Sequence, residues 1–127
     1  MSYGFSKTVA LSHEQAIVKV TEALKQEGFG VLTTIDVKET LQTKLGVEFN
    51  KYVILGACNP PFAHRALQAE EEIGLLLPCN IIVYERENET VVSAFNPMSM
   101  TKLIDNPAML PIAEEVTQRL RRAIEAI

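Results

Sequence analysis

The chain has 127 residues, and its 12 Lys and Arg against 16 Asp and Glu give a formal net charge of −4. This length suits one domain, because two halves would each be too small to bury a secure core. The 47% apolar content argues against a disordered chain. The acidic balance argues against the basic face that nucleic-acid binding requires. We therefore expect one globular α+β domain over residues 1–127, without a nucleic-acid partner.

The compartment is predicted from two further features. The N-terminus lacks the charged and then apolar pattern of a secretory signal. The longest uncharged apolar stretch, residues 73–84, is too short for a membrane span. We expect a cytoplasmic protein with no membrane partner, in which Cys58 and Cys79 stay reduced instead of forming a structural disulfide.

The first strand is predicted over about residues 3–11, and a helix follows it. Ser12 and Gln15 have the spacing of a capping box, and Gly28 is well placed to end the helix. The helix carries one apolar face at helical spacing: Ala16, Ile17, Val20, Ala23 and Leu24.

A second strand is predicted over 29–36, followed by a short helix. Asp36 and Glu39 repeat the capping-box pattern, and Gly46 ends the helix. Its apolar residues lie four apart: Val37, Leu41 and Leu45.

The run from Tyr52 to Cys58 has few polar side chains, so we expect a strand inside the sheet that is buried on both faces. Asn59 and Pro60 then have the pattern of an N-cap followed by proline at the first helical position. The predicted helix continues to about Glu72.

The last third of the chain is predicted to hold a hairpin and a helix. Residues 80–85 and 90–95 are expected to pair across a turn at residues 87–89. Asn96 and Pro97 predict a short helical turn. The final helix should start near Pro111, because proline interrupts a helix. It carries one apolar stripe: Ile112, Val116, Leu120, Ala123, Ile124 and Ile127.

The element order β-α-β-α-β-α-β-β-α predicts the α+β class. We expect a mainly antiparallel sheet of about five strands, with the helices packed on one side.

Candidate chemistry gathers where the apolar strand 52–58 ends. Cys58 lies one residue before the helix cap Asn59, where free amides and the helix dipole favour a thiolate. His64 follows on the same helix and could act as an acid, a base or a ligand. The simpler alternative is that Cys58 fills the core as a small apolar residue and that His64 only packs.

A second cysteine and asparagine, Cys79 and Asn80, stand at the start of the next apolar strand. If strands 52–58 and 80–85 are antiparallel, residues 59–78 connect them at one end, and both Cys-Asn pairs meet there with His64. A parallel pair would separate the two cysteines to opposite ends. We favour the antiparallel arrangement because the following hairpin already requires it.

These segments resemble the domain of unknown function 302 family. The similarity covers nearly the whole chain, and it rests most clearly on Leu55-Gly56-Ala57-Cys58-Asn59-Pro60-Pro61, Ala63-His64-Arg65-Ala66-Leu67 and Ile73-Gly74-Leu75-Leu76-Leu77-Pro78-Cys79-Asn80. The resemblance implies a compact α+β domain with a curved antiparallel sheet, similar in architecture to the TATA-binding proteins, and a homodimer. It supplies no activity, and a shared fold does not imply DNA binding in an acidic chain.

Our leading functional hypothesis is a homodimeric ligand-binding or regulatory module. A small molecule would occupy a cleft between the two Cys-Asn segments, with Asn59 and Asn80 donating or accepting hydrogen bonds and Arg65 facing an anionic group. No cofactor is expected.

Three alternatives remain open. In a thiol enzyme or redox protein, Cys58 would be the nucleophile, His64 its proton partner and Cys79 a resolving thiol. A soft copper or zinc site could draw on the same three residues together with Met98 and Met100, although no metal-ligand spacing is present. In a purely structural reading, the cysteines fill the core.

Overall fold

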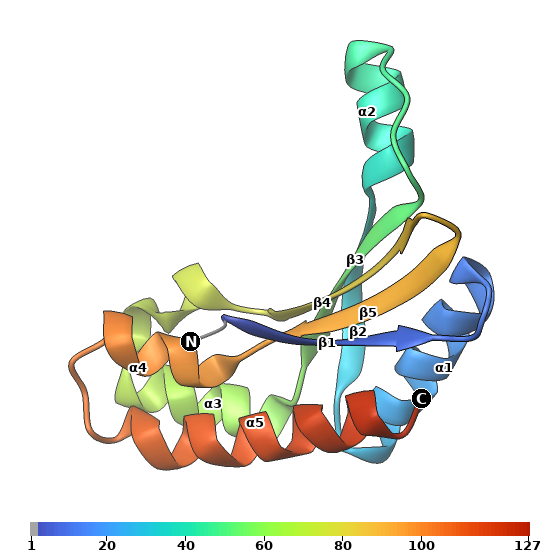
Figure 1. Cartoon of the computed structure of the whole chain (residues 1–127). Helices are drawn as coiled ribbons and strands as arrows, with labels where there is room; N and C mark the ends of the chain where they lie inside the picture. Colours follow the sequence, from blue (N-terminus) through green and yellow to red (C-terminus); the bar gives the residue numbers. More distant parts are fainter. Residues whose placement is uncertain (1–2) are drawn as a thin grey trace.

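A computed structural model describes residues 3–127 (Figure 1). Its elements in chain order are β1 (Gly4–Val9), α1 (His13–Gln26), β2 (Gly30–Asp36), α2 (Val37–Leu45), β3 (Tyr52–Cys58), α3 (Pro60–Ala69), the 3-10 helix η1 (Glu71–Leu76), β4 (Cys79–Arg86), β5 (Glu89–Phe95), the 3-10 turn η2 (Pro97–Ser99), α4 (Met100–Leu103) and α5 (Met109–Glu125).

The described residues form a five-stranded sheet in the order β1-β5-β4-β3-β2, and every neighbouring pair is antiparallel. Figure 1 shows a curved sheet with α1, α3 and α5 on one face, while α2 projects away from the other elements. The predicted α+β class, the antiparallel sheet and the one-sided helices are therefore confirmed.

The core lies between the sheet and the helices. Strand β3 alternates along its first half, with Val53 and Leu55 buried toward the helices and Tyr52 and Ile54 half-buried on the open face. The expectation that this strand is buried on both faces was therefore wrong, because no helix covers the second face of the sheet in the described part of the chain. Its position inside the sheet, between β4 and β2, is as predicted.

Local capping signals gave correct helix starts at α1 and α2. The Ser12 hydroxyl accepts from the Gln15 amide, and the Gln15 side chain accepts from the Ser12 amide, which completes the capping box. Asp36 accepts from the Glu39 amide at 3.0 Å. Gly46 ends α2 in the left-handed conformation at φ 65°, which glycine adopts without strain.

Two predicted helix boundaries were wrong. Helix α5 begins at Met109 and not near Pro111, because a proline in the first turn removes an amide that has no intrahelical acceptor anyway. Helix α3 ends at Ala69, before the expected Glu72, because Glu70 is extended and the next residues tighten into η1.

The predicted hairpin turn is also one residue too long. Arg86 pairs with Glu89, so the loop contains only Glu87 and Asn88. Both have positive φ, 53° and 67°, as a two-residue type I′ turn requires.

Gly56 of β3 provides a close approach that no other residue type would allow. A Cβ there would lie 2.8 Å from Cγ of Pro78 and would also overlap Oγ1 of Thr33. Both neighbours are short, rigid side chains, so the backbone would have to move.

We therefore expect Gly56→Ala to lower the free energy of unfolding by about 1–3 kcal/mol, as overpacking typically does. Urea denaturation measures this change. Gly30→Ala is the matched control, because a Cβ at Gly30 meets no atom of the described residues within 4 Å. It should change stability by no more than about 0.5 kcal/mol. Equal effects of the two substitutions would contradict the steric explanation.

Candidate functional site

An apolar cavity of about 330 Å³ lies at the end of the sheet where β3 finishes and β4 begins. Phe62 and Ala66 of α3 form one wall, and Ile112 and Val116 of α5 form another. Leu32 of β2 also lines it and is 68% exposed, so the cavity opens toward this edge of the sheet.

Both cysteines belong to this cavity. Strands β3 and β4 are antiparallel, and Ala57 is the register partner of Cys79. Paired Cα atoms in such a ladder are about 4.5–5.5 Å apart, so Cys58 is one residue from the partner of Cys79. The antiparallel arrangement that we favoured is confirmed, and it brings the two sulfur-bearing segments to one end of the sheet.

The two thiols differ in their surroundings. Cys58 is half-buried, whereas Cys79 is only 7% exposed. Burial, with a smaller contribution from neighbouring Cys58, raises the pKa of the Cys79 thiol to about 11. Cys79 therefore stays protonated at neutral pH, and a protonated thiol is a poor nucleophile and a poor metal ligand.

Asn59 occupies the N-cap position of α3, as predicted, but its side chain makes no capping hydrogen bond within residues 3–127. Its Nδ2 instead donates to the backbone oxygen of Glu27 at 3.2 Å. Asn59 is buried and lines the cavity. It therefore ties the end of α1 to the start of α3, and this tie holds one corner of the cavity in place.

The other predicted site residues lie outside the cavity wall. His64 and Arg65 are exposed on α3. The Arg65 guanidinium lies 5.3 Å from the ring centroid of Phe62, and Arg119 of α5 lies at the same distance. Asn80 is exposed and faces the open side of the sheet, since its neighbours Cys79 and Ile81 face the helices. The structure thus brings together Cys58, Cys79 and Asn59, and it does not bring His64, Arg65 or Asn80 to the cavity.

The arrangement offers little for a metal ion. Among the residues that the structure describes, no group of three His, Cys, Asp or Glu side chains is placed to hold one. Met100 lines the cavity beside the cysteines, but Met98 does not.

Sequence reasoning missed most of the cavity wall. Phe29 comes from the connection between α1 and β2, whereas Ile112 and Val116 come from α5. The apolar stripe of the last helix was visible, but we interpreted it only as core. The sequence feature that could have indicated a cavity is the set of small residues Ala63, Ala66 and Ala113. Small side chains leave space between elements that larger side chains would fill.

Comparisons with known proteins agree with this architecture. Residues 5–127 match the family described as Domain of unknown function DUF302. The chain belongs to this family. It is also similar to the crystal structure of an uncharacterized conserved DUF302 protein from Bacillus stearothermophilus, with 33% sequence identity and a TM-score of 0.93. That match covers 99% of this chain and 98% of the other. No curated protein matches the chain.

No helix in the described part of this DUF302 protein is long and apolar enough to cross a membrane.

The raised pKa of Cys79 predicts a specific dependence of stability on pH. Between about pH 9 and pH 11 the thiol ionises in the unfolded chain but stays protonated in the folded one. Stability is therefore lost as the pH rises through this range, by up to about 2–3 kcal/mol.

Urea denaturation at several pH values between 8 and 10.5, compared with Cys79→Ala, measures this contribution. The half-buried Tyr52, whose pKa burial also raises, is present in both proteins, so its contribution cancels in the difference. Parallel pH profiles for the wild type and Cys79→Ala would contradict the prediction.

Proposed function

We propose that this DUF302 protein is a homodimeric module that binds a small, mainly apolar molecule, with residues 1–127 acting as one domain. The observation that carries the proposal is the cavity at the two Cys-Asn segments, whose wall is almost entirely apolar. Small-molecule sites are typically concave and mostly apolar, with a few polar groups that orient the ligand.

The dimensions of the cavity support a ligand of limited size. Its volume of about 330 Å³ is at the lower end of the range for small-molecule sites. At about 30 Å³ for each water-sized group, it would hold roughly ten non-hydrogen atoms. Each buried methylene contributes about 0.8 kcal/mol, so a short hydrocarbon chain or a small ring system would bind measurably.

Few polar atoms could orient such a ligand. Thr33, Cys58 and Asn59 line the wall and carry a hydroxyl, a thiol and an amide group, and the Asn59 Nδ2 already donates to Glu27. One hydroxyl or carbonyl group on the ligand would match these atoms. The proposal does not depend on Arg65 or Asn80, which lie outside the wall.

The thiol-enzyme alternative has less support. The resolving role needs an ionisable Cys79, but burial raises the pKa of this thiol to about 11. The proton-partner role needs His64 beside Cys58, yet His64 is exposed and outside the cavity wall. The free cysteines are consistent with the cytoplasm, where we expect this protein to act.

A thermal-shift screen tests the proposal. The panel comprises decanoic acid, 1-decanol and indole as apolar probes, with glucose and adenosine monophosphate as polar ones. We expect at least one apolar probe to raise Tm, by roughly 10 °C at a hundredfold excess over Kd, and the polar probes to leave it unchanged.

Ala113→Leu supplies the control at the site, because it fills the cavity with larger side-chain volume and should abolish the shift. Ala108→Leu adds the same atoms at an exposed position outside the wall and should respond like the wild type. The proposal fails if no apolar probe stabilises the wild type, or if Ala113→Leu responds equally.

Sedimentation equilibrium tests the homodimer separately. We expect a particle of twice the 14.1 kDa chain mass at micromolar concentration. A particle of the single-chain mass up to the highest soluble concentration would contradict this part of the proposal.

A further inference from the structure

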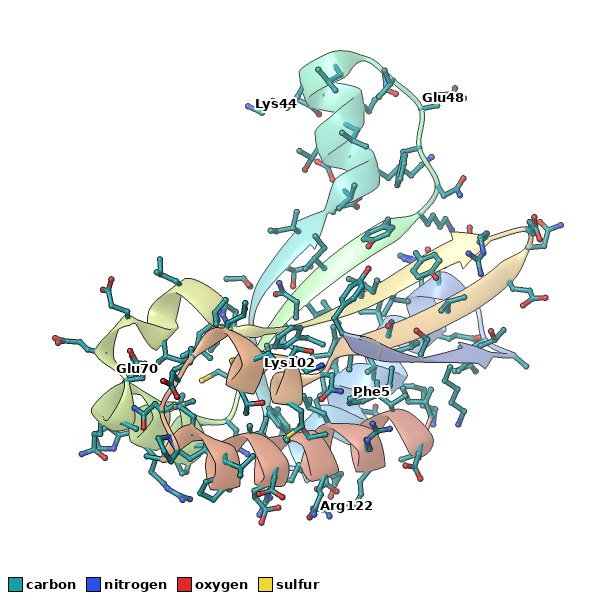
Figure 2. The ribbon with its side chains drawn as sticks, turned by 60° about the vertical axis from the view of Figure 1, so that its left-hand side comes forward. Phe5, Lys44, Glu48, Glu70, Lys102 and Arg122 are labelled. Atoms are coloured by element: carbon teal, nitrogen blue, oxygen red, sulfur yellow. The ribbon has the colours of Figure 1, made fainter. Side chains whose placement is uncertain are left out.

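A second feature of the chain contributes only Leu32 and Thr33 to the cavity wall among the described residues. The β2–α2 arm, defined as residues 30–50, comprises β2, α2 and the returning segment that leads to β3. Figure 1 shows α2 projecting away from the sheet and the other helices. In Figure 2 the labelled Lys44 and Glu48 lie at the tip of the arm, far from Phe5 and Arg122.

The arm is poorly covered by the rest of the chain. No residue of α2 is buried in the described structure. An isolated helix of nine residues is unstable in water, because helices of this length depend on the packing of an apolar face. Lys38 donates to the backbone oxygen of Phe49 at 2.9 Å, which links the helix only to its own returning segment.

Apolar side chains are concentrated on this arm. Of the eleven large apolar side chains that are exposed within residues 3–127, five belong to it: Leu32, Ile35, Leu45, Val47 and Phe49. Strand β2 is also at the edge of the sheet, with its outer hydrogen-bonding groups facing no other described strand. Apolar edge strands of this kind are usually covered by another element or another chain.

The arm has the properties of a self-complementary surface. Val37, Leu41 and Leu45 lie four apart on one side of α2, with Leu45 exposed and Val37 and Leu41 half-buried, and the spacing is symmetric about Leu41. Two antiparallel copies of this helix would set Leu41 against Leu41 and Val37 against Leu45, as an isologous contact requires.

Charge and size also favour a second copy as the occupant. The arm carries charges of both signs: Lys38 and Lys44, and Asp36, Glu39 and Glu48. Two copies of the arm would therefore not repel each other strongly. A stable interface usually involves about twenty residues on each side, which is about the length of the arm.

We propose that two copies of this chain associate through their β2–α2 arms, with the α2 helices antiparallel about a twofold axis near Leu41. This inference rests on the proposed homodimer and names the surface that forms it. The antiparallel arrangement directs the tip of each arm, with Leu45 and Val47, toward Ile35 at the base of the partner arm. Leu32, near the start of the arm, lines the cavity, so the arm connects the proposed interface to the wall of the ligand site.

Sedimentation velocity of the full chain over a dilution series tests the surface. Leu45→Asp places two carboxylates in each dimer, one from each copy, and should raise the dimer dissociation constant about 100-fold, with a tenfold loss for each. Leu45 is 67% exposed, so the monomer loses little packing, and an unchanged circular dichroism spectrum confirms that the variant is folded. Leu103→Asp is the matched control, since Leu103 is 73% exposed on α4, and it should leave the dissociation constant unchanged.

Cysteine cross-linking tests the antiparallel geometry in a Cys58→Ser background. Leu41→Cys should form a covalent dimer under mild oxidation, because the two introduced thiols face each other across the axis. Thr43→Cys should not, because two residues along a helix place it on the opposite side.

The outcomes separate this inference from the proposed function. A dimer that persists with Leu45→Asp, or that cross-links through Thr43→Cys and not through Leu41→Cys, overturns the arm as the interface and leaves the homodimer standing. A wild-type chain that stays monomeric overturns both, while the ligand screen remains an independent test of the cavity.

Discussion

The antiparallel pairing of β3 with β4 is the interaction on which the rest of the candidate site depends. Because the two strands run in opposite directions, the end of one and the start of the other lie at the same end of the sheet. The intervening α3 and η1 must stay at that end, where α3 becomes a wall of the cavity. A parallel pair would have required a crossover that carried Cys79 away from Cys58.

The cavity exists because small side chains meet where larger ones would fill the space. Ala63 and Ala66 of α3 and Ala113 of α5 all line it, and the remaining wall is mostly aliphatic. Protein interiors are normally packed as densely as organic crystals, so this open cavity marks a place where the sheet and the helices do not close on each other. Its wall offers few polar partners for water, and a mainly apolar ligand is the occupant that its surface favours.

In the β2–α2 arm the local structure is complete, but the tertiary packing is not. Asp36 caps α2 and Gly46 ends it, so both ends of the helix have a local stabilising interaction. Even so, its apolar residues have no core to enter within the described chain. Disagreement between local structure and packing tends to occur at functional surfaces. A partner copy would remove the disagreement by burying the apolar side of α2.

The sequence by itself determined the fold class, the order of the elements and most helix ends, because these depend on hydrogen bonds and periodicities within a few residues, as at Ser12 and Asp36. It also predicted that Cys58 and Cys79 converge, since the following hairpin favoured antiparallel strands. The start of α5 escaped it because proline is tolerated in a first helical turn. Only the tertiary structure decided that Asn59 would bind Glu27, 32 residues away, and that distant apolar segments would enclose a cavity instead of closing completely. The physical reason is that helix caps and turns are short-range interactions, whereas the meeting of two faces depends on apolar surface that segments far apart in the chain bury together.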